Sequence, residues 1–371
     1  MGLKVKTSRK KKINLLMISS TSSLGGGTKH MFSLGENLGE EFKVFYALPI
    51  NYNFSEILNS ENHILISERK ITLKDIFNLK NFVKRNSIDI IHAHGKGAGV
   101  IARILLFFFN MPLIYTFHGI HLQCHNLIKR LAYIFYEYLL GGLDSRKVLV
   151  SQSEKSYAQE KKIFLGNKSI IIRNGVSNMP RKGSQGIEDK FKNQLISSKI
   201  KVISLCRFVD QKNIKDIVKI ASMIPNLDFF IIGNGPLMKE IKSFISKLKI
   251  SNVFLLGEKK SVFEYLYSSD IYLSTSLYEG LPISILEAMS IGLPIVASNV
   301  IGNCDTIENG KSGFLYELKE IDVAANYLVK LSSNNELRKE MGNSAFLRQR
   351  KLFSKDSMIT NYKDLYREEL A

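Results

Sequence analysis

Two carboxylates stand eight positions apart in the segment Glu279-Gly-Leu281-Pro282-Ile-Ser-Ile-Leu-Glu287. Proline is typical of the first turn of a helix, so the segment predicts a loop followed by a helix N-terminus. Glu279 could accept hydrogen bonds from sugar hydroxyls, Glu287 could bind a ribose diol, and the free N–H groups from Leu281 to Ser284 could take a phosphate. Eight residues are a little over two helical turns, which predicts that both carboxylates lie on roughly one side.

Arg207 and Lys212 lie five residues apart on a loop that follows the predicted strand Lys201–Leu205 and precedes a helix beginning near Asn213. Two cations that converge at a helix start can hold a diphosphate and offset the charge that develops as it leaves. The chemistry predicted is leaving-group catalysis by fixed cations. In a chain with 52 Lys and Arg residues, a solvated surface pair is the alternative interpretation.

Two glycine loops also follow predicted strands. Gly25-Gly26-Gly27 opens a helix, and Gly233-Asn-Gly235-Pro236 places a proline like the first-turn residue of another helix. Glycine lets a ligand approach the backbone, so both loops are candidate donor-binding loops, although either could be a tight turn without a ligand. Neither matches the Gly-x-Gly-x-x-Gly dinucleotide pattern.

All seven histidines fall in the first half of the chain. His118, His121 and His125 have spacing that resembles metal ligands on a helix. However, His118 directly follows the predicted strand Leu113–Thr116, so the three histidines are not expected on one continuous helix, and no acidic ligand lies nearby. We therefore expect no metal site, and we expect His118 to have a polar role facing the ligand.

The positioning elements follow from an alternation of β-rich and helical patterns, which is typical of parallel sheets covered by helices. In the first half we expect strands at Ile13–Ser19, Lys43–Leu48, His63–Ile66, Ile88–His92, Leu113–Thr116, Lys147–Ser151 and Ser169–Arg173. In the second half we expect strands at Lys201–Leu205, Asp228–Ile232, Asn252–Leu256, Asp270–Ser274, Pro294–Ala297 and Gly313–Tyr316. The fold class predicted is α/β, with two Rossmann-like doubly wound domains facing each other across a cleft.

The domain bounds follow from breaks in this alternation. We expect a basic tail over residues 1–12, a first domain over 13–177 and a Pro-, Gly- and Ser-rich linker over 178–195. A second domain then covers 196–350, and a C-terminal helix over 351–371 crosses back to the first domain.

Composition narrows the class of protein. The chain has 371 residues, 45% of them hydrophobic, and a formal net charge of +18, which indicates a folded protein with an anionic partner. Three scattered cysteines argue against a disulfide framework and favour a reducing compartment. The most apolar run, Ile101 to Phe109, is too short to span a bilayer, so we expect no transmembrane helix. The stretch Leu127 to Leu140 suits either an amphipathic helix on a membrane surface or a core-packing helix.

Together these residues resemble the retaining glycosyltransferases of family 4, which have the GT-B fold. The most specific match is Glu279-x7-Glu287 within Ser276-Leu-Tyr-Glu-Gly-Leu-Pro282. Supporting matches are Arg207 and Lys212, Gly233-x-Gly235-Pro236, Asn174-Gly175-Val176 and Thr116-Phe117-His118-Gly119. Two departures are Cys206, where the family commonly has glycine, and Gly302-Asn303-Cys304-Asp305 in place of Gly-Gly-x-Pro-Glu.

The resemblance implies a hexosyltransferase that uses a nucleotide diphosphate sugar, without a metal or other cofactor. The acceptor would be a glycan or a lipid-linked glycan of cell-surface polysaccharide synthesis. It implies that the protein is cytoplasmic and peripheral on the inner face of the plasma membrane, with an anionic membrane surface and no nucleic acid as partner. The implied catalytic residues are Arg207, Lys212, Glu279 and His118, and the implied donor-binding residues are Gly26, Gly27, Gly233, Gly235, Leu281, Pro282, Ile283 and Glu287.

Three other functions would use part of these features. A nucleotide-sugar epimerase or hydrolase would need the donor residues but no second sugar, and a non-catalytic glycan-binding relative would need neither cation. A nucleic-acid-binding protein would exploit the +18 charge, but the sequence contains no recognition-helix or aromatic RNA motif.

Overall fold

The computed structural model describes residues 12–22, 25–51, 62–68, 71–120, 122, 126–163, 168–177, 199–259 and 261–371. The expected linker at 178–195 and nearly all of the expected basic tail lie outside these residues. The chain divides into two compact units. Unit 1 comprises Met1–Leu149, Ala158–Ile172 and Ile359–Ala371, and unit 2 comprises Val150–Tyr157 and Arg173–Met358.

Unit 1 contains a seven-stranded sheet in the order β3-β2-β1-β4-β5-β6-β7, in which every pairing is parallel. Its strands are β1 Ile13–Ser19, β2 Phe42–Pro49, β3 His63–Ile66, β4 Ile90–His94, β5 Leu113–Thr116, β6 Arg146–Leu149 and β7 Ser169–Ile171. The strand order runs outward from β1 in one direction and then reverses at β4. Ligands of doubly wound sheets bind at the carboxyl ends of the strands beside such a reversal.

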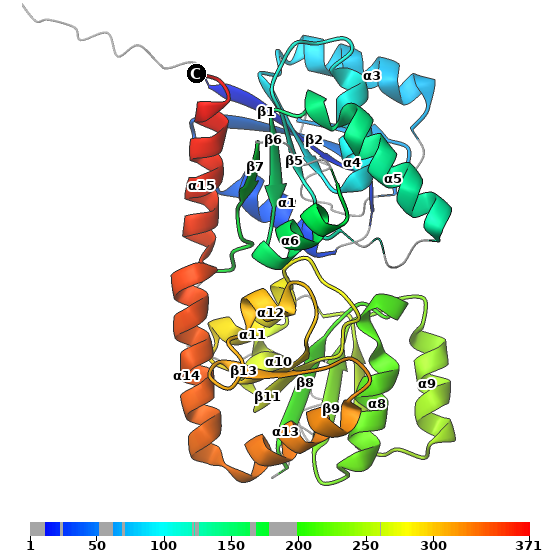
Figure 1. Ribbon diagram of the computed structural model, residues 1–371, viewed down its shortest axis with the longest axis vertical. Helices are drawn as coiled ribbons and strands as arrows, with labels where there is room; N and C mark the ends of the chain where they lie inside the picture. The colour runs from blue at the N-terminus through cyan, green and yellow to red at the C-terminus, as the bar shows by residue number, and fades with distance from the viewer. Residues whose placement is uncertain are drawn as a thin grey trace, which may run out of the picture. The chain divides into compact units, whose positions relative to one another are not determined.

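Helices connect these strands and cover the sheet of unit 1 (Figure 1). They are α1 Gly26–Glu36, α3 Leu73–Arg85, α4 Lys96–Leu105 and α5 Leu127–Leu140; α6 Gln152–Glu160 begins in unit 2 and ends in unit 1. Helix α3 begins with a capping box between Thr72 and Asp75, which satisfies two N–H groups of its first turn. The last helix, α15 Lys355–Glu368, buries Tyr362 and Tyr366 completely.

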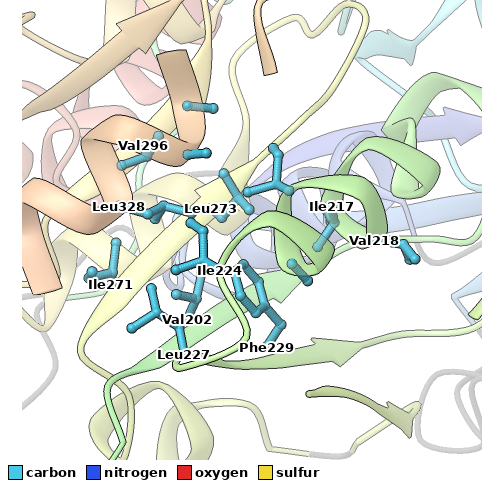
Figure 2. Packing of buried hydrophobic residues seen from close by; sticks show 14 of the residues in the cluster. Val202, Ile217, Val218, Ile224, Leu227, Phe229, Ile271, Leu273, Val296 and Leu328 are labelled. Carbon is cyan, nitrogen blue, oxygen red and sulfur yellow. The ribbon is translucent and has the colours of Figure 1, made fainter. Parts of the chain in front are cut away.

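Unit 2 contains a six-stranded parallel sheet in the order β10-β9-β8-β11-β12-β13. Its strands are β8 Lys201–Leu205, β9 Asp228–Ile232, β10 Val253–Gly257, β11 Ile271–Ser274, β12 Ile295–Ser298 and β13 Gly313–Tyr316. The order reverses between β8 and β11. One hydrophobic cluster of this unit packs Val202, Phe229 and Leu273 of the sheet against α8 and α13 (Figure 2).

The helices of unit 2 follow the strands in turn. They are α8 Ile214–Met223, α9 Met238–Lys247, α10 Phe263–Tyr267, α11 Ile283–Ser290, α12 Asn303–Thr306, α13 Ile321–Ser333 and α14 Asn335–Leu352. Helix α8 buries Ile214, Ile217, Val218 and Ala221 on one face, which is the helical period of its apolar residues.

The α/β class with two doubly wound sheets is confirmed, and six strands have the bounds expected from sequence: Ile13–Ser19, His63–Ile66, Leu113–Thr116, Lys201–Leu205, Asp228–Ile232 and Gly313–Tyr316. The expected strand Ile88–His92 was placed two residues too early, because β4 spans Ile90–His94. Because β4 continues to His94, it pairs with β1 from Leu15↔Ile90 to Ser19↔His94. The last strand residues therefore carry side chains to the ligand end of the sheet.

Candidate active site

An ion pair joins two loops of unit 2 at the point where the strand order reverses. Lys212 lies on the loop after β8, Glu279 lies on the loop after β11, and Lys212 Nζ is 2.5 Å from Glu279 Oε1. Both side chains are largely shielded from solvent. Since β8 and β11 are neighbours in the sheet, residues 67 positions apart in the chain meet at one edge.

Hydrogen bonds hold the same two loops together. Gln211 Nε2 donates to the carbonyl oxygen of Tyr278 over 2.9 Å, and Leu277 N–H donates to the carbonyl oxygen of Gln211 over 2.8 Å. Thr275 Oγ1 donates to the carbonyl oxygens of Lys212 and Asn213, each over 3.0 Å. The position of the Lys212 ammonium is therefore fixed by backbone contacts as well as by its carboxylate partner.

The loop after β8 turns into α8 through an unusual residue. Asn213 has a φ of +47°, a left-handed conformation that asparagine tolerates better than most residues. It ends the short helix Asp210–Lys212 and caps α8. Arg207 lies earlier on this loop with an exposed side chain.

The glycines of the loop after β9 brace the loop that carries Arg207. A Cβ atom on Gly233 would lie 1.9 Å from the Cys206 carbonyl oxygen, and one on Gly235 would lie 2.6 Å from the Phe208 carbonyl oxygen. Phe208 N–H also donates to the Asn234 carbonyl oxygen over 2.9 Å. Backbone packing requires glycine at both positions, independently of any contact with a ligand.

The expected place of Pro236 in a first helical turn was wrong. Helix α9 begins at Met238, and Leu237 N–H donates instead to the Phe208 carbonyl oxygen over 3.0 Å. That bond ties the backbone before the helix to the loop after β8 and delays the helix start by two residues.

The two glutamates are not related by helical periodicity, which corrects the expectation that they lie two turns apart. Helix α11 begins only at Ile283, so Glu279 precedes it by four residues and Glu287 lies within it. The stretch between them is fixed by Asn174, whose buried Nδ2 donates to the Leu281 carbonyl oxygen over 2.8 Å. Leu281 and Pro282 are buried, whereas Ile283 and Glu287 are half-buried.

The segment from Gly302 supports the Glu279 loop from the other side. Gly302 has a φ of +83°, and a Cβ atom there would lie 2.4 Å from the Gly280 carbonyl oxygen. Asp305 accepts the backbone N–H groups of Gln152 and Ser153 at the start of α6. Asp305, which departs from the Gly-Gly-x-Pro-Glu pattern noted in the sequence, therefore has structural partners within unit 2, the N–H groups of Gln152 and Ser153.

A small hollow lies beside Lys212, with room for about one water molecule. It is lined by Tyr272 of β11, by Cys206 and Lys212 of the loop after β8, and by Ser284 of α11. Burial raises the pKa of the Cys206 thiol to about 12, so this cysteine is a neutral wall of the hollow.

In unit 1 the corresponding strand ends gather histidines. His118 follows β5 with a φ of +57°, and its Nε2 lies 3.0 Å from Nδ1 of His94 at the end of β4. His30 of α1 contacts the His118 ring edge to face, with centroids 4.7 Å apart. A Cβ atom on Gly27 would lie 3.3 Å from the His118 ring, so the glycine loop leaves room for this imidazole.

A fourth histidine connects this cluster to the C-terminal helix. His92 Nδ1 lies 2.7 Å from the Tyr366 hydroxyl, and His92 Nε2 lies 2.8 Å from Thr116 Oγ1. Burial holds the pKa values of His92, His94 and His118 well below their usual range, and neighbouring histidines lower them further. These three imidazoles are therefore uncharged at neutral pH.

Three of these histidines have the arrangement of metal ligands. One ring nitrogen each of His30, His94 and His118 lies within 4.8 Å of the others, and uncharged imidazoles are the form that binds a metal. His121 and His125, which form the spacing noted in the sequence, lie outside the described residues. Sequence spacing thus pointed to a different trio from the one the fold assembles.

Comparison with known proteins identifies the family. Residues 186–348 match the family described as Glycosyl transferases group 1, and residues 24–178 match Glycosyltransferase Family 4. The chain belongs to the family 4 glycosyltransferases. The two matches together cover both units, including the Lys212–Glu279 pair and the histidine cluster.

Some relatives of this glycosyltransferase are named for steps of glycan assembly. It is 27% identical to an Escherichia coli UDP-Gal:alpha-D-GlcNAc-diphosphoundecaprenol alpha-1,3-galactosyltransferase, over 71% of this chain and 72% of that one. It is 29% identical to the E. coli O-antigen biosynthesis glycosyltransferase WbnH, over 67% and 69%. Its fold matches the crystal structure of Anabaena HepE in complex with UDP and glucose, with a TM-score of 0.83, 17% identity and coverage of 96% and 99%.

Sequence reasoning missed the contribution of His30, His92 and His94. One signal was available: His94 lies two positions beyond His92, the last residue of the predicted strand Ile88–His92, and residues two apart in an extended strand point to the same face. No local sequence pattern predicted that His30 contacts His94 and His118. These contacts arise because the strand order places α1, which follows β1, near the ends of β4 and β5.

Gly233→Ala is expected to lower stability by about 2–4 kcal/mol, because the added methyl group meets the Cys206 carbonyl oxygen and φ is +139°. Urea unfolding followed by circular dichroism measures this, since the chain has no tryptophan. Gly142→Ala is the control, because nothing lies within 4 Å of its Cβ position. Equal stability of the two variants would contradict the bracing role of Gly233.

Stability is expected to fall between pH 7.5 and pH 5.5. Histidines whose folded pKa values lie below the unfolded value of about 6.5 stabilise fully above that pH, and the stabilisation is lost as the pH falls toward the folded values. Each such group adds a slope of up to about 1.4 kcal/mol per pH unit.

Urea unfolding at a series of pH values checks this expectation. His94→Gln should flatten the dependence, whereas His63→Gln on β3, outside the cluster, should leave it unchanged. A flat profile in the parent protein would mean that the histidines are hydrated in solution.

Proposed function

We propose that this glycosyltransferase transfers a hexose from a nucleotide diphosphate sugar to a glycan or lipid-linked glycan, with retention of anomeric configuration and without a metal. The observation that carries the proposal is the shielded Lys212–Glu279 pair at the strand reversal of unit 2. A cation for the diphosphate and a carboxylate for sugar hydroxyls are the two groups that a sugar-nucleotide donor needs side by side.

In this proposal Lys212 and Arg207 bind the donor diphosphate and stabilise it as it leaves. A cation held by backbone contacts and a carboxylate does not have to reorganise as negative charge grows on the leaving group. The Lys212 ammonium stays beside Glu279 and also contacts the donor phosphate, while Glu279 accepts hydrogen bonds from the transferred sugar. Glu287 binds the ribose diol, and the backbone at Gly233, Gly235 and Leu281–Ile283 contacts the nucleotide.

The reaction needs no covalent enzyme intermediate. The bond between the anomeric carbon and the diphosphate oxygen breaks, and the acceptor hydroxyl oxygen attacks from the same face. The acceptor proton passes to the departing diphosphate oxygen, so atoms and charge balance. His118, uncharged and placed beside Gly27, contacts the sugar and acceptor as a neutral hydrogen-bonding group, together with the backbone of Gly26 and Gly27.

The names of the relatives support the proposed acceptor class. One of them is named for an acceptor on diphosphoundecaprenol and another for O-antigen biosynthesis, and HepE was crystallised with UDP and glucose. We therefore propose a uridine nucleotide donor, a lipid-linked acceptor and action at the inner face of the plasma membrane. A nucleotide-sugar hydrolase or epimerase would use the same donor residues, and product analysis distinguishes these reactions.

Lys212→Ala is expected to lower kcat by about 10²- to 10³-fold, because it removes one fixed cation from the leaving diphosphate. Release of nucleotide diphosphate from UDP-, GDP- and ADP-hexoses in the presence of a glycan-lipid acceptor measures the rate. Lys215→Ala is the matched control, since this lysine is exposed and pairs with Glu240 on a neighbouring helix. Unchanged turnover of Lys212→Ala would exclude its leaving-group role.

The product is expected to keep the anomeric configuration of the donor, at the same rate in excess EDTA as without it. Proton NMR of the purified product gives the configuration from the coupling of its anomeric proton. An inverted product would exclude same-face attack. Loss of activity in EDTA that Mg²⁺, Mn²⁺ or Zn²⁺ restores would contradict the metal-free proposal and direct attention to His30, His94 and His118.

A further inference from the structure

Three histidines from separate elements of unit 1 converge at the carboxyl ends of neighbouring strands. His30 lies on α1, which follows β1, whereas His94 ends β4 and His118 follows β5. Their ring centroids are 4.7 Å apart for His30 and His118, 5.3 Å for His94 and His118, and 5.7 Å for His30 and His94. One ring nitrogen of each lies within 4.8 Å of those of the other two.

These separations suit three imidazoles that share one metal ion. Zinc binds an imidazole nitrogen at about 2.0–2.1 Å with tetrahedral angles, which places ligand nitrogens roughly 3.4 Å apart and ring centroids roughly 5 Å apart. The three centroid distances lie on both sides of that value. Side-chain adjustments of roughly 1 Å would therefore bring all three nitrogens to tetrahedral spacing.

The ring of His94 gives a second, independent indication of a ligand. Its side chain is only 5% exposed, and its Nδ1 contacts Nε2 of His118 over 3.0 Å. Its Nε2 is buried and has no hydrogen-bond partner in the described part of the chain. Buried polar atoms are usually paired with protein, water or an ion, because an unpaired one costs free energy. A bound metal ion would give this ring the partner that it needs.

The ligand set selects the class of metal. The trio offers only imidazole nitrogens, and no carboxylate or thiolate of the described residues joins it. Mg²⁺ and Ca²⁺ need oxygen ligands, whereas Zn²⁺, Co²⁺, Ni²⁺ and Cu²⁺ bind imidazole well. Three protein ligands also leave a fourth tetrahedral position for water or another small ligand. His118 is half-buried, so solvent can reach the trio on its side.

The surroundings of the trio favour an exchangeable ion over a permanent one. The nearest rings are uncharged: His92 lies 3.9 Å from His94 between centroids, and Tyr362 lies 5.4 Å from His30. A metal-binding imidazole usually donates its other N–H to a carboxylate or carbonyl, and loss of such a partner weakens binding about 10- to 100-fold. Among the described residues His94 has neither.

We propose that His30, His94 and His118 form a reversible Zn²⁺ site with an open fourth position, and that bound zinc inhibits the enzyme. The ion takes no part in transfer, and the metal-free protein is the active form. In the proposed function His118 contacts the sugar and the acceptor, and an ion on its ring nitrogen blocks that contact. Zinc binding rests on the three histidines alone, whereas inhibition rests on the proposed function.

Zinc titration of the untagged, metal-free, full-length protein against a chromophoric zinc indicator tests binding without donor or acceptor. We expect one ion per chain, removed by EDTA. X-ray absorption of the zinc-loaded protein should show nitrogen ligands at about 2.0–2.1 Å and no sulfur near about 2.3 Å. Both measurements use the parent protein, so they do not depend on the folding of a variant.

Two single variants test the ligands. His30→Gln and His94→Gln should each weaken zinc binding at least about tenfold, since even the loss of a partner behind a ligand costs that much. His63→Gln on β3 is the matched control and should bind zinc like the parent protein. Circular dichroism verifies that each variant is folded.

A double variant distinguishes this trio from the one that the sequence spacing suggests. His121→Gln/His125→Gln should bind zinc like the parent protein, because neither residue belongs to the trio. If this variant loses zinc while His30→Gln keeps it, the proposed site is wrong and the metal belongs to His118, His121 and His125.

Release of nucleotide diphosphate is measured in parallel, with each variant compared with its own metal-free rate. At a zinc concentration ten times the parent dissociation constant, the parent rate should fall about tenfold, because only about a tenth of the chains remain free of zinc. His30→Gln should lose at most about twofold at this concentration, since its site is at most about half occupied. Equal inhibition of both would mean that zinc acts on the donor.

Three results would overturn the zinc site: no binding by the parent protein, sulfur among the ligands, or binding that neither His30→Gln nor His94→Gln weakens. Full zinc occupancy with an unchanged rate would overturn the inhibition. Transfer activity without zinc binding would overturn the zinc site alone, and zinc binding without transfer would overturn the proposed function alone.

Discussion

The constraint on which the site depends is the reversal of strand order within each parallel sheet. In unit 1 the reversal lies between β1 and β4, and in unit 2 between β8 and β11. Connections leave these neighbouring strands in opposite directions, so their carboxyl ends are free to hold side chains from distant parts of the chain. The Lys212–Glu279 pair and the His94–His118 contact both occur there. In each unit, the grouping of these side chains is thus a consequence of topology before it is a consequence of any motif.

The two strand reversals hold different chemistry. Unit 2 presents charged groups whose positions are fixed by close backbone packing, with glycines at 233, 235 and 302 where any side chain would meet a carbonyl oxygen. Unit 1 presents uncharged imidazoles, because burial disfavours the protonated form of His92, His94 and His118. A fixed cation suits a departing diphosphate, whereas a neutral, hydrogen-bonding wall suits sugar hydroxyls.

Buried charge also determines the surface of unit 1. Arg103 interrupts the most apolar run of the sequence, and its contacts with Glu137 and Asp144 hold α5 with its polar face inward. The apolar face is then left to solvent or to a partner. Neither α5 nor any other helix in the described part of the chain is long and apolar enough to cross a membrane.

The sequence by itself determined the fold class, several strands to the residue and the family, because hydrophobic period and glycine or proline punctuation are local properties. It also determined Glu279-x7-Glu287 as the most informative segment. Tertiary structure alone decided that Lys212 pairs with Glu279, since that contact needs β8 and β11 to be neighbours, and that Gly233 and Gly235 are required for backbone approach. It alone brought His30, His94 and His118 together from three elements. It also decided which face of α5 is exposed, because the leucine pattern fits a buried helix equally well until Glu137 finds Arg103.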